Sequence, residues 1–179
     1  VLMPDGQYEV TTFRDDGTYT DGRHPDTVQF VQELDIDLAR RDFTINAMAY
    51  KERTGVIDLF GGREDLKKGV IACVGDAEKR FSEDALRILR AVRFASVYDF
   101  EIEEKTSAAI HRRLAALKQV STERINSELC KLLHGKGCAR ILMEYRDIIA
   151  EIIPEMSASI DFDQNSRYHI YTVYDHIVY

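Results

Sequence analysis

Two short stretches of this 179-residue chain place arginines beside carboxylates, a combination suited to binding phosphates and nucleotides. In Arg40-Arg41-Asp42, two forked guanidinium groups could bind phosphate oxygens, and the carboxylate could accept a hydrogen bond from a ribose hydroxyl. The second stretch runs from Glu83-Asp84 to three arginines at helical spacing, Arg87, Arg90 and Arg93. An aspartate three residues before an arginine can present an acceptor and a donor side by side, as reading a base edge requires.

Each stretch also has a simpler interpretation. Charged runs are usually solvated, and Asp42 could favour the positive end of a helix dipole. The arginines after Asp84 could make ordinary ion pairs on the wet face of an amphipathic helix. The presence of arginine without lysine favours forked donors in the second stretch, but helical spacing alone leaves both interpretations open.

Other carboxylates are weaker candidates. Glu9 alternates with Tyr8 and Val10 in a predicted strand, where a lone carboxylate is usually the solvent-facing residue. Asp58, just before Gly61-Gly62, is typical of a turn at the end of a strand. Asp35-Ile36-Asp37 has an Asp-x-Asp form but comes directly before the arginine pair without a glycine-rich turn, so we interpret it as the lead-in to a helix.

The composition limits the classes of protein that fit. The chain is 45% apolar and 31% charged, as expected of a globular protein rather than a disordered or fibrous one. No apolar run approaches the roughly 18 residues of a membrane helix, and the three cysteines form no CxxC pair, which argues against a disulfide scaffold and for the cytoplasm. With a net charge of −7, any nucleic-acid contact requires a local basic face.

The elements that would position these residues divide into a strand-rich first part and a helical second part. Strands are predicted at 8–13, 27–31, 55–60 and 70–74, with a loop at 14–25 that contains two Asp-Gly pairs. A helical pattern covers 34–50. After Gly75 the chain is predicted to be helical with few interruptions, with helices over 85–95, 103–117, 121–133 and 136–147. Since the chain starts at Val1 and ends inside a patterned stretch, we expect a piece of a longer polypeptide.

Several of these residues form an ordered set of motifs that resembles a known family. Arg40-Arg41-Asp42-Phe43-Thr44-Ile45-Asn46-Ala47 resembles motif B of the class II (bacterial-type) CCA-adding and poly(A) polymerase family, and Asp58-Leu59-Phe60-Gly61-Gly62 resembles motif C. Glu83-Asp84-Ala85-Leu86-Arg87 resembles motif D, and Arg124-Ile125 with Glu128-Leu129 resembles motif E. Four motifs in this order make the resemblance specific from about residue 8 to about residue 133.

The resemblance implies an α+β fold in three parts. Residues 1–60 would be the C-terminal part of a polymerase-β-like nucleotidyltransferase head, with a mixed sheet and helices. Residues 61–134 would be an all-α neck that recognises the nucleotide, and residues 135–179 the start of a helical body or HD-like region. The loop at 15–25 resembles the flexible loop of the family, and Tyr168-His169 and Asp175-His176 resemble the entry to an HD-type region.

The resemblance also implies roles for individual residues. Arg41 would contact the triphosphate or ribose of a nucleotide, and Asp42 the ribose hydroxyl. Asp84 and Arg87 would read the base edges of cytosine and adenine, and Glu9 would be the third catalytic carboxylate. Further nucleotide or phosphate contacts would come from Arg90 and Arg93.

The implied function is template-independent addition of CCA to the 3′ end of tRNA from CTP and ATP, by two-metal phosphoryl transfer with Mg²⁺. Motif A, the glycine-rich turn with the Asp-x-Asp metal pair, is absent, so we expect its ligands N-terminal to Val1, no metal site in this chain, and no catalysis by this chain alone. A poly(A) polymerase, a CC- or A-adding enzyme, a non-catalytic RNA- or nucleotide-binding module and an HD phosphohydrolase remain as alternatives. The sequence does not determine the oligomeric state.

Overall fold

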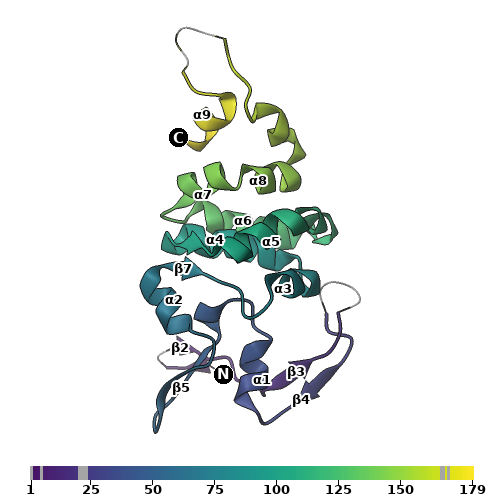
Figure 1. Ribbon diagram of the computed structural model, residues 1–179, viewed down its shortest axis with the longest axis vertical. Coiled ribbons are helices and arrows are strands. Elements are labelled where there is room, and N and C mark those ends of the chain that lie inside the picture. The colour runs from purple at the N-terminus through teal and green to yellow at the C-terminus, as the bar shows by residue number, and fades with distance from the viewer. Residues whose placement is uncertain (1, 5, 20–23, 166–167, 169) are drawn as a thin grey trace.

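The computed structural model describes residues 2–4, 6–19, 24–165, 168 and 170–179. Figure 1 shows short strands and helices at one end of an elongated molecule, layers of helices above them, and the C-terminal helix at the other end. The predicted loop 14–25 and the pair Tyr168-His169 therefore lie partly outside the described residues. In the described part, no helix is both long and apolar enough to span a bilayer.

Two hairpins open the chain. Strands β1 (Leu2–Met3) and β2 (Gly6–Gln7) pair with each other, and β3 (Arg14–Asp16) pairs with β4 (Val28–Phe30). The strand predicted at 27–31 is confirmed. The strand predicted at 8–13 is wrong, because no strand in the described part of the chain pairs with these residues in a ladder; at the end of the segment, the amide of Val31 donates to the carbonyl of Phe13 at 3.0 Å. A strand needs such a partner to satisfy its backbone polar groups.

The segment predicted as one helix over 34–50 contains three elements. Helix α1 (Leu34–Ala39) is followed by a 3₁₀ turn, η1 (Thr44–Asn46), and by β5 (Met48–Lys51), which pairs with β6 (Gly55–Asp58). The helix prediction is wrong beyond Ala39, because backbone groups after this residue form hydrogen bonds with a distant segment of the chain instead of within a helix. The amide of Thr44 donates to the carbonyl of Ala72 at 2.9 Å, and that of Val74 donates to the carbonyl of Asp42 at 3.0 Å.

Helix α2 (Gly62–Lys68) begins directly after the turn predicted at Asp58. Gly61 adopts a left-handed conformation with φ 78°, which favours glycine. The carboxylate of Asp58 accepts hydrogen bonds from the amides of Gly62 and Arg63, both at 2.9 Å, and these bonds lower its pKa, chiefly through Arg63. Asp58 thus forms the turn at the end of its strand, as predicted from the sequence.

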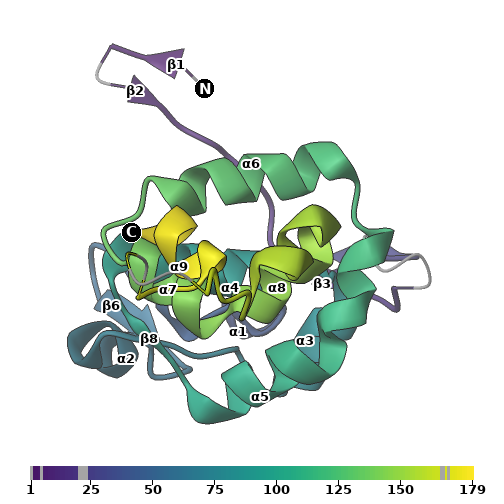
Figure 2. The same cartoon turned by 90° about the horizontal axis from the view of Figure 1, so that it is seen from above.

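The second half is helical, as predicted. Helix α4 (Leu86–Tyr98) lies at its centre, and the strands β7 (Val70–Ile71) and β8 (Glu101–Ile102) pair in parallel beside it. Figure 2 shows α6 along one side of α4 and the β1–β2 hairpin beyond α6. The other helical elements are α3 (Ala77–Glu83), α5 (Glu104–Arg113), η2 (Leu114–Gln119), α6 (Thr122–Leu133), α7 (Cys138–Glu144), α8 (Arg146–Ile152), η3 (Pro154–Ser159) and α9 (Val173–Val178).

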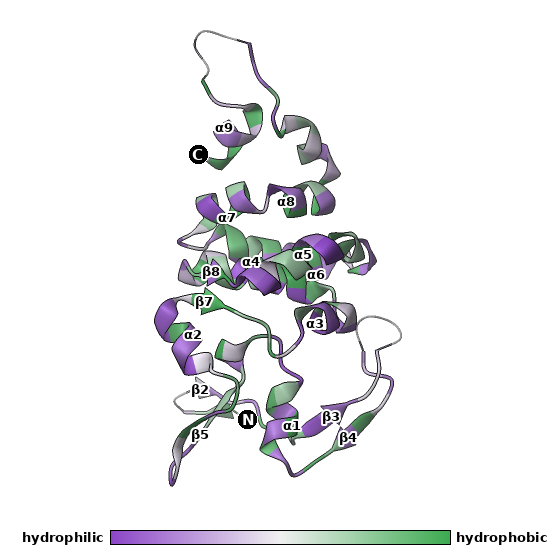
Figure 3. Cartoon of the chain, viewed as in Figure 1, coloured by the Kyte–Doolittle hydropathy of each residue, from purple (hydrophilic) through white to green (hydrophobic). Residues whose placement is uncertain are grey.

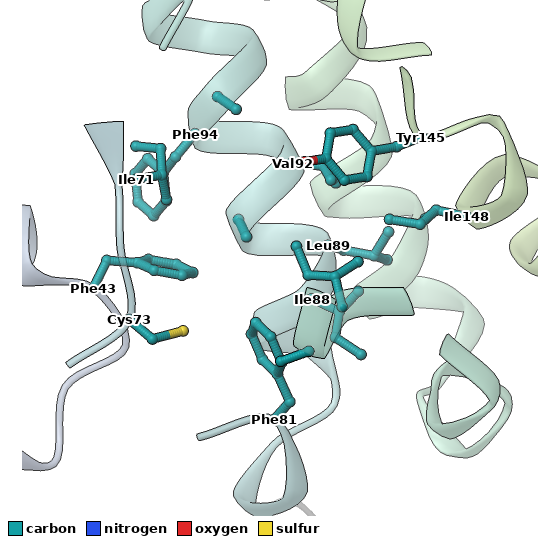
Figure 4. Close-up of a cluster of buried hydrophobic side chains, with 14 of the residues drawn as sticks. Phe43, Ile71, Cys73, Phe81, Ile88, Leu89, Val92, Phe94, Tyr145 and Ile148 are labelled. Carbon is teal, nitrogen blue, oxygen red and sulfur yellow. The ribbon is translucent and has the colours of Figure 1, made fainter. Parts of the chain in front are cut away.

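One hydrophobic core joins the strand-rich part to the helices. In Figure 3, β7 is hydrophobic and β3 is hydrophilic. Consistent with this, Ile71 of β7 is buried in the core, and β3 contributes no residue to it. The predicted apolar face of α4 is confirmed: Ile88, Leu89 and Val92 are buried. Figure 4 shows these side chains packed with residues from both parts of the chain, including Phe43, Ile71, Cys73, Phe81, Phe94, Tyr145 and Ile148. Residues before and after Gly75 therefore share one hydrophobic core.

Candidate nucleotide site

A cavity of about 580 Å³ brings together the two arginine-rich stretches identified in the sequence. It lies between the segment that follows α1 and the start of α4, and residues from both line it. Five of the seven predicted site residues line this cavity: Arg41, Asp42, Asp84, Arg87 and Arg90. The remaining lining residues are Thr11, Arg40, Asn46, Leu86, Phe94 and Arg124. Because the arginines outnumber the carboxylates, the cavity is suited to an anionic ligand.

Asp42 is held firmly in the cavity wall. Its side chain is 9% exposed, and Nε and Nη2 of Arg90 donate to its Oδ2 at 2.7 and 2.6 Å. Its Oδ1 accepts from the amide of Phe43 at 2.9 Å and from Nδ2 of Asn46 at 3.1 Å. Four donors thus converge on one carboxylate, and a ribose hydroxyl would have to share or replace one of them.

Arg87 is oriented by its neighbours and keeps donors free. Its Nη1 donates to Oε2 of Glu83 at 2.6 Å and to the carbonyl of Arg80 at 3.1 Å, and its Nη2 donates to the carbonyl of Arg40 at 3.2 Å. Glu83 also accepts from Nη2 of Arg80 at 2.8 Å, which fixes the carboxylate. Across the described residues, Nε and one hydrogen of Nη2 of Arg87 have no acceptor, so these donors are available to a ligand.

Asp84 lies at the break between α3 and α4. It has extended backbone, φ −149° and ψ 108°, just before α4 begins. Its Oδ1 accepts from the amide of Leu86 at 3.0 Å, so the side chain caps α4. Its Oδ2 accepts from Nη2 of Arg124 at 2.8 Å. The carboxylate that would read a base is therefore oriented from both sides.

Among the cavity residues predicted to bind the nucleotide, Arg41 is the most accessible, with 43% of its side chain exposed. Its Nη2 donates to Oδ2 of Asp37 at 3.2 Å, and its Nη1 donates to the carbonyl of Asn46 at 3.3 Å. Asp37 lies inside α1 rather than before it, and is 3% exposed. Burial raises the pKa of Asp37, but donors from Arg40 and Arg41 outweigh burial and lower it. This carboxylate therefore anchors both arginines.

Two predicted site residues do not line this cavity. Nε of Arg93 donates to Oε2 of Glu128 at 2.8 Å, and its guanidinium lies 3.5 Å from the centroid of the Phe94 ring. Glu128 is 5% exposed and also accepts from Nζ of Lys131 at 3.0 Å. Glu9 is exposed in an irregular segment. The structure thus places Arg93 in an interface between helices, and Glu9 outside the cavity.

Sequence reasoning missed Arg124 as a site residue, although it lies in the stretch that resembles motif E. It is 40 residues from Asp84, and no periodicity connects the two before α6 packs on α4. Arg40 was noted only with its neighbour, and the structure shows its guanidinium bonded to Asp16 and Asp37. Asn46 and Phe94 have no chemical signal of their own in the sequence.

The described residues do not fit a two-metal centre. Within them, no group of three or more histidine, cysteine, aspartate or glutamate side chains is arranged to hold a metal ion. The carboxylates of the cavity are instead committed to arginine and backbone donors. What the cavity offers chemically is therefore a set of arginine donors beside firmly held carboxylates, an arrangement suited to an anionic ligand.

Comparison with known proteins defines the class. Residues 1–72 match the family described as Poly A polymerase head domain, and residues 99–160 match the one described as Probable RNA and SrmB- binding site of polymerase A. The chain belongs to the family of class II nucleotidyltransferases that contains poly(A) polymerases and CCA-adding enzymes. The predicted α+β fold with a polymerase head is thereby confirmed.

Curated relatives with similar sequences are named CCA-adding enzymes. The chain is 50% identical over 148 residues to that of Leuconostoc mesenteroides, covering 82% of this chain and 37% of the relative. It resembles the solved CCA-adding enzyme of Bacillus stearothermophilus in complex with CTP, with a TM-score of 0.71 and 45% identity over 84% of this chain and 35% of that one. The Thermotoga maritima CCA-adding enzyme complexed with tRNA matches with a TM-score of 0.61 and 38% identity, over 68% of this chain and 31% of that one. The chain thus spans about a third of the length of these proteins.

Proposed function

We propose that the protein is a template-independent nucleotidyltransferase that adds CCA to the 3′ end of tRNA from CTP and ATP. The observation that carries the proposal is that Arg41 and Asp42 line the same cavity as Asp84, Arg87 and Arg90, although more than 40 residues separate the two stretches in the chain. The similarity to enzymes solved with CTP and with tRNA supports this choice of substrates.

In the proposed site, Asp84 and Arg87 recognise the base. Asp84 offers the lone pairs of its carboxylate that its own hydrogen bonds leave unused to an exocyclic amino group. Arg87 offers Nε and Nη2 hydrogens to ring nitrogen and carbonyl acceptors. Both cytosine and adenine present an amino donor beside a ring acceptor, so one donor–acceptor pair can select them against bases that lack the amino group. Glu83 and Arg124 hold this pair rigid, which reduces the entropy lost on binding.

The remaining predicted roles surround this pair. Exposed Arg41 would bind the triphosphate or ribose. Asp42 would accept a hydrogen bond from a ribose hydroxyl, and Arg90, its ion-pair partner, would add a nucleotide or phosphate contact. Arg93, which lies beside Phe94, would add a nucleotide or phosphate contact, and Glu9 would supply a catalytic carboxylate. Mg²⁺ belongs to the proposal for the whole protein, where it would supply charge neutralisation for phosphoryl transfer. The division into a head at 1–60, a neck at 61–134 and a body from 135, together with action in the cytoplasm, completes the proposal.

The deciding experiment uses the full-length protein, a tRNA transcript lacking its CCA end, CTP, ATP and Mg²⁺, with products resolved to single nucleotides. Addition of three nucleotides is expected. A ladder would identify a poly(A) polymerase, addition of two or one a CC- or A-adding enzyme, and nucleotide binding without addition a non-catalytic module. Arg87→Ala should abolish addition, whereas Arg63→Ala, an exposed arginine of α2 outside the cavity, should not.

A further inference from the structure

The β5–β6 hairpin offers a surface that lies outside the candidate nucleotide site. In the described part of the chain its two strands pair only with each other, so one edge of each strand is open. In Figure 1 the hairpin projects from the strand-rich end of the molecule, away from the helical layers. No residue of either strand lines the candidate nucleotide site. An open strand edge presents backbone N–H and C=O groups that can pair with a further strand.

One face of the hairpin exposes two apolar side chains. Tyr50 and Val56 are directly opposite each other in the register, so they lie on the same face. They are 73% and 46% exposed. Ala49, which points to the other face, packs against the small buried cluster that contains Leu38. The hairpin is therefore anchored by one face, while the other leaves an aromatic–aliphatic pair uncovered.

Unpaired arginines lie at both ends of this apolar pair. Arg53 is in the turn of the hairpin, and Arg63 follows β6, with its backbone amide bonded to Asp58. Neither guanidinium group makes an ion pair or a hydrogen bond with any described residue, whereas every other arginine that the structure describes pairs with a carboxylate. With a net charge of −7, the chain has carboxylates in excess. These two positive charges are therefore available to an anionic partner.

The alternation along β5 indicates what kind of strand its open edge fits. Tyr50 and its neighbour Lys51 point to opposite faces, and the ammonium group of Lys51 makes no ion pair with the residues that the structure describes. A strand beside β5 therefore meets an apolar side chain at one position and a positive charge at the next. The stabilising cross-strand neighbours are then apolar and acidic in turn. RNA phosphates would match the charges, but they would leave Tyr50 and the backbone edge without partners.

We infer that the open edge of β5 docks an extended segment of a protein partner in which acidic and apolar side chains alternate. The segment adds to the hairpin as a third strand, with its backbone paired to β5 and its apolar side chains packed on Tyr50. Its acidic side chains pair with Lys51 and Arg53, and Arg63 adds positive potential at the other end of the hairpin. The inference goes beyond the proposed function, and a docked segment should leave nucleotide addition unaffected, because the surface lies outside the candidate nucleotide site.

The test measures binding of a fluorescein-labelled peptide of four Val-Glu repeats to the full-length protein, by fluorescence anisotropy. Binding is expected, and it should weaken as salt is added, because the ion pairs are exposed. Lys51→Glu and Arg53→Glu should each raise the Kd about threefold to tenfold, because an attractive pair becomes repulsive. The same peptide with proline in place of one central valine should bind more weakly by a similar factor, since proline cannot donate to a strand ladder.

Lys136→Glu is the matched control. Lys136 is an exposed lysine between α6 and α7 that also makes no ion pair within the described part of the chain. Its substitution should leave the Kd for the peptide unchanged, and circular dichroism checks that all three variants remain folded.

The outcomes separate this inference from the proposed function. The inference is overturned if the unsubstituted protein does not bind the peptide below about 1 mM, if the control loses as much affinity, or if the proline peptide binds equally well. Loss of tRNA affinity in Lys51→Glu and Arg53→Glu, with peptide binding unchanged, would overturn it as well and assign the surface to RNA. Failure of the unsubstituted protein to add CCA would refute only the proposed function.

Discussion

The ion pair between Arg93 and Glu128 is expected to stabilise the packing of α6 on α4. Glu128 is 5% exposed and the Arg93 side chain 12%, so the pair is shielded from solvent. Replacing one partner of a buried pair leaves a buried charge unpaired and typically costs about 3–5 kcal/mol. Lys131, with its side chain 56% exposed, also donates to Glu128 at 3.0 Å, so the carboxylate has one shielded and one solvent-exposed partner.

For Glu128→Gln we expect the free energy of unfolding at pH 7 to fall by about 3 kcal/mol. This is the lower end of the range for a broken buried pair, because the amide oxygen of glutamine still accepts a hydrogen bond from Arg93. For a chain of this length, that corresponds to a melting temperature lower by roughly 6–12 °C. Replacing both partners by apolar residues, Arg93→Met with Glu128→Leu, should recover most of the loss, because no charge is then left buried.

The effect should depend on pH. Burial raises the pKa of Glu128, but donors from Lys131 and Arg93 outweigh burial and hold it below its ordinary value of 4.5. A carboxyl whose pKa is depressed by folding stabilises the folded state above its unfolded pKa, and this contribution disappears as the pH falls through the folded pKa. The advantage of the unsubstituted protein over Glu128→Gln should therefore be full above about pH 4.5 and shrink below it.

Urea unfolding at several pH values, followed by circular dichroism, measures these differences. Glu123→Gln is the control, since it is the same change at an exposed position in the first turn of the same helix. A loss below about 1 kcal/mol for Glu128→Gln would refute the reasoning, because that is the range of an exposed pair. An equal loss in the control, or a difference that does not change with pH, would refute it as well.

Three further outcomes are expected. Arg87→Ala should weaken CTP binding about 5-fold to 150-fold by calorimetry, the value of a lost bidentate base contact, and an unchanged affinity would remove Arg87 from the site. Gly135→Ala should lower the urea midpoint by the equivalent of about 1–3 kcal/mol, because a Cβ there would overlap Oγ of Ser96 and lie 2.6 Å from the carbonyl oxygen of the same residue; a neutral effect would contradict that close packing. Burial raises the pKa of Cys73 to about 12, so a thiol reagent at pH 8 should label exposed Cys130 first and Cys73 only on unfolding, and labelling at equal rates would show that this core opens.

The sequence predicted the helical second half well because its signal is local. The apolar spacing of Ile88, Leu89 and Val92 reports one buried face, and the structure buries all three. The first half was predicted less well. Residues 8–13 have strand propensity but form no ladder with any strand in the described part of the chain, and 48–51, which has a helical pattern, pairs with 55–58 instead. Strand formation depends on a distant ladder that local propensity does not encode.

The family and the types of residue at the candidate site could be read from the sequence, because the motifs from Arg40 to Arg124 stand in a recognisable order. Which arginines line the cavity depends on how the helices pack. Arg90 and Arg93 are equivalent in spacing, yet the first pairs with Asp42 in the cavity wall and the second with Glu128 between helices. Helical periodicity fixes the angle at which a side chain leaves its helix, whereas its partner depends on the element packed against that face.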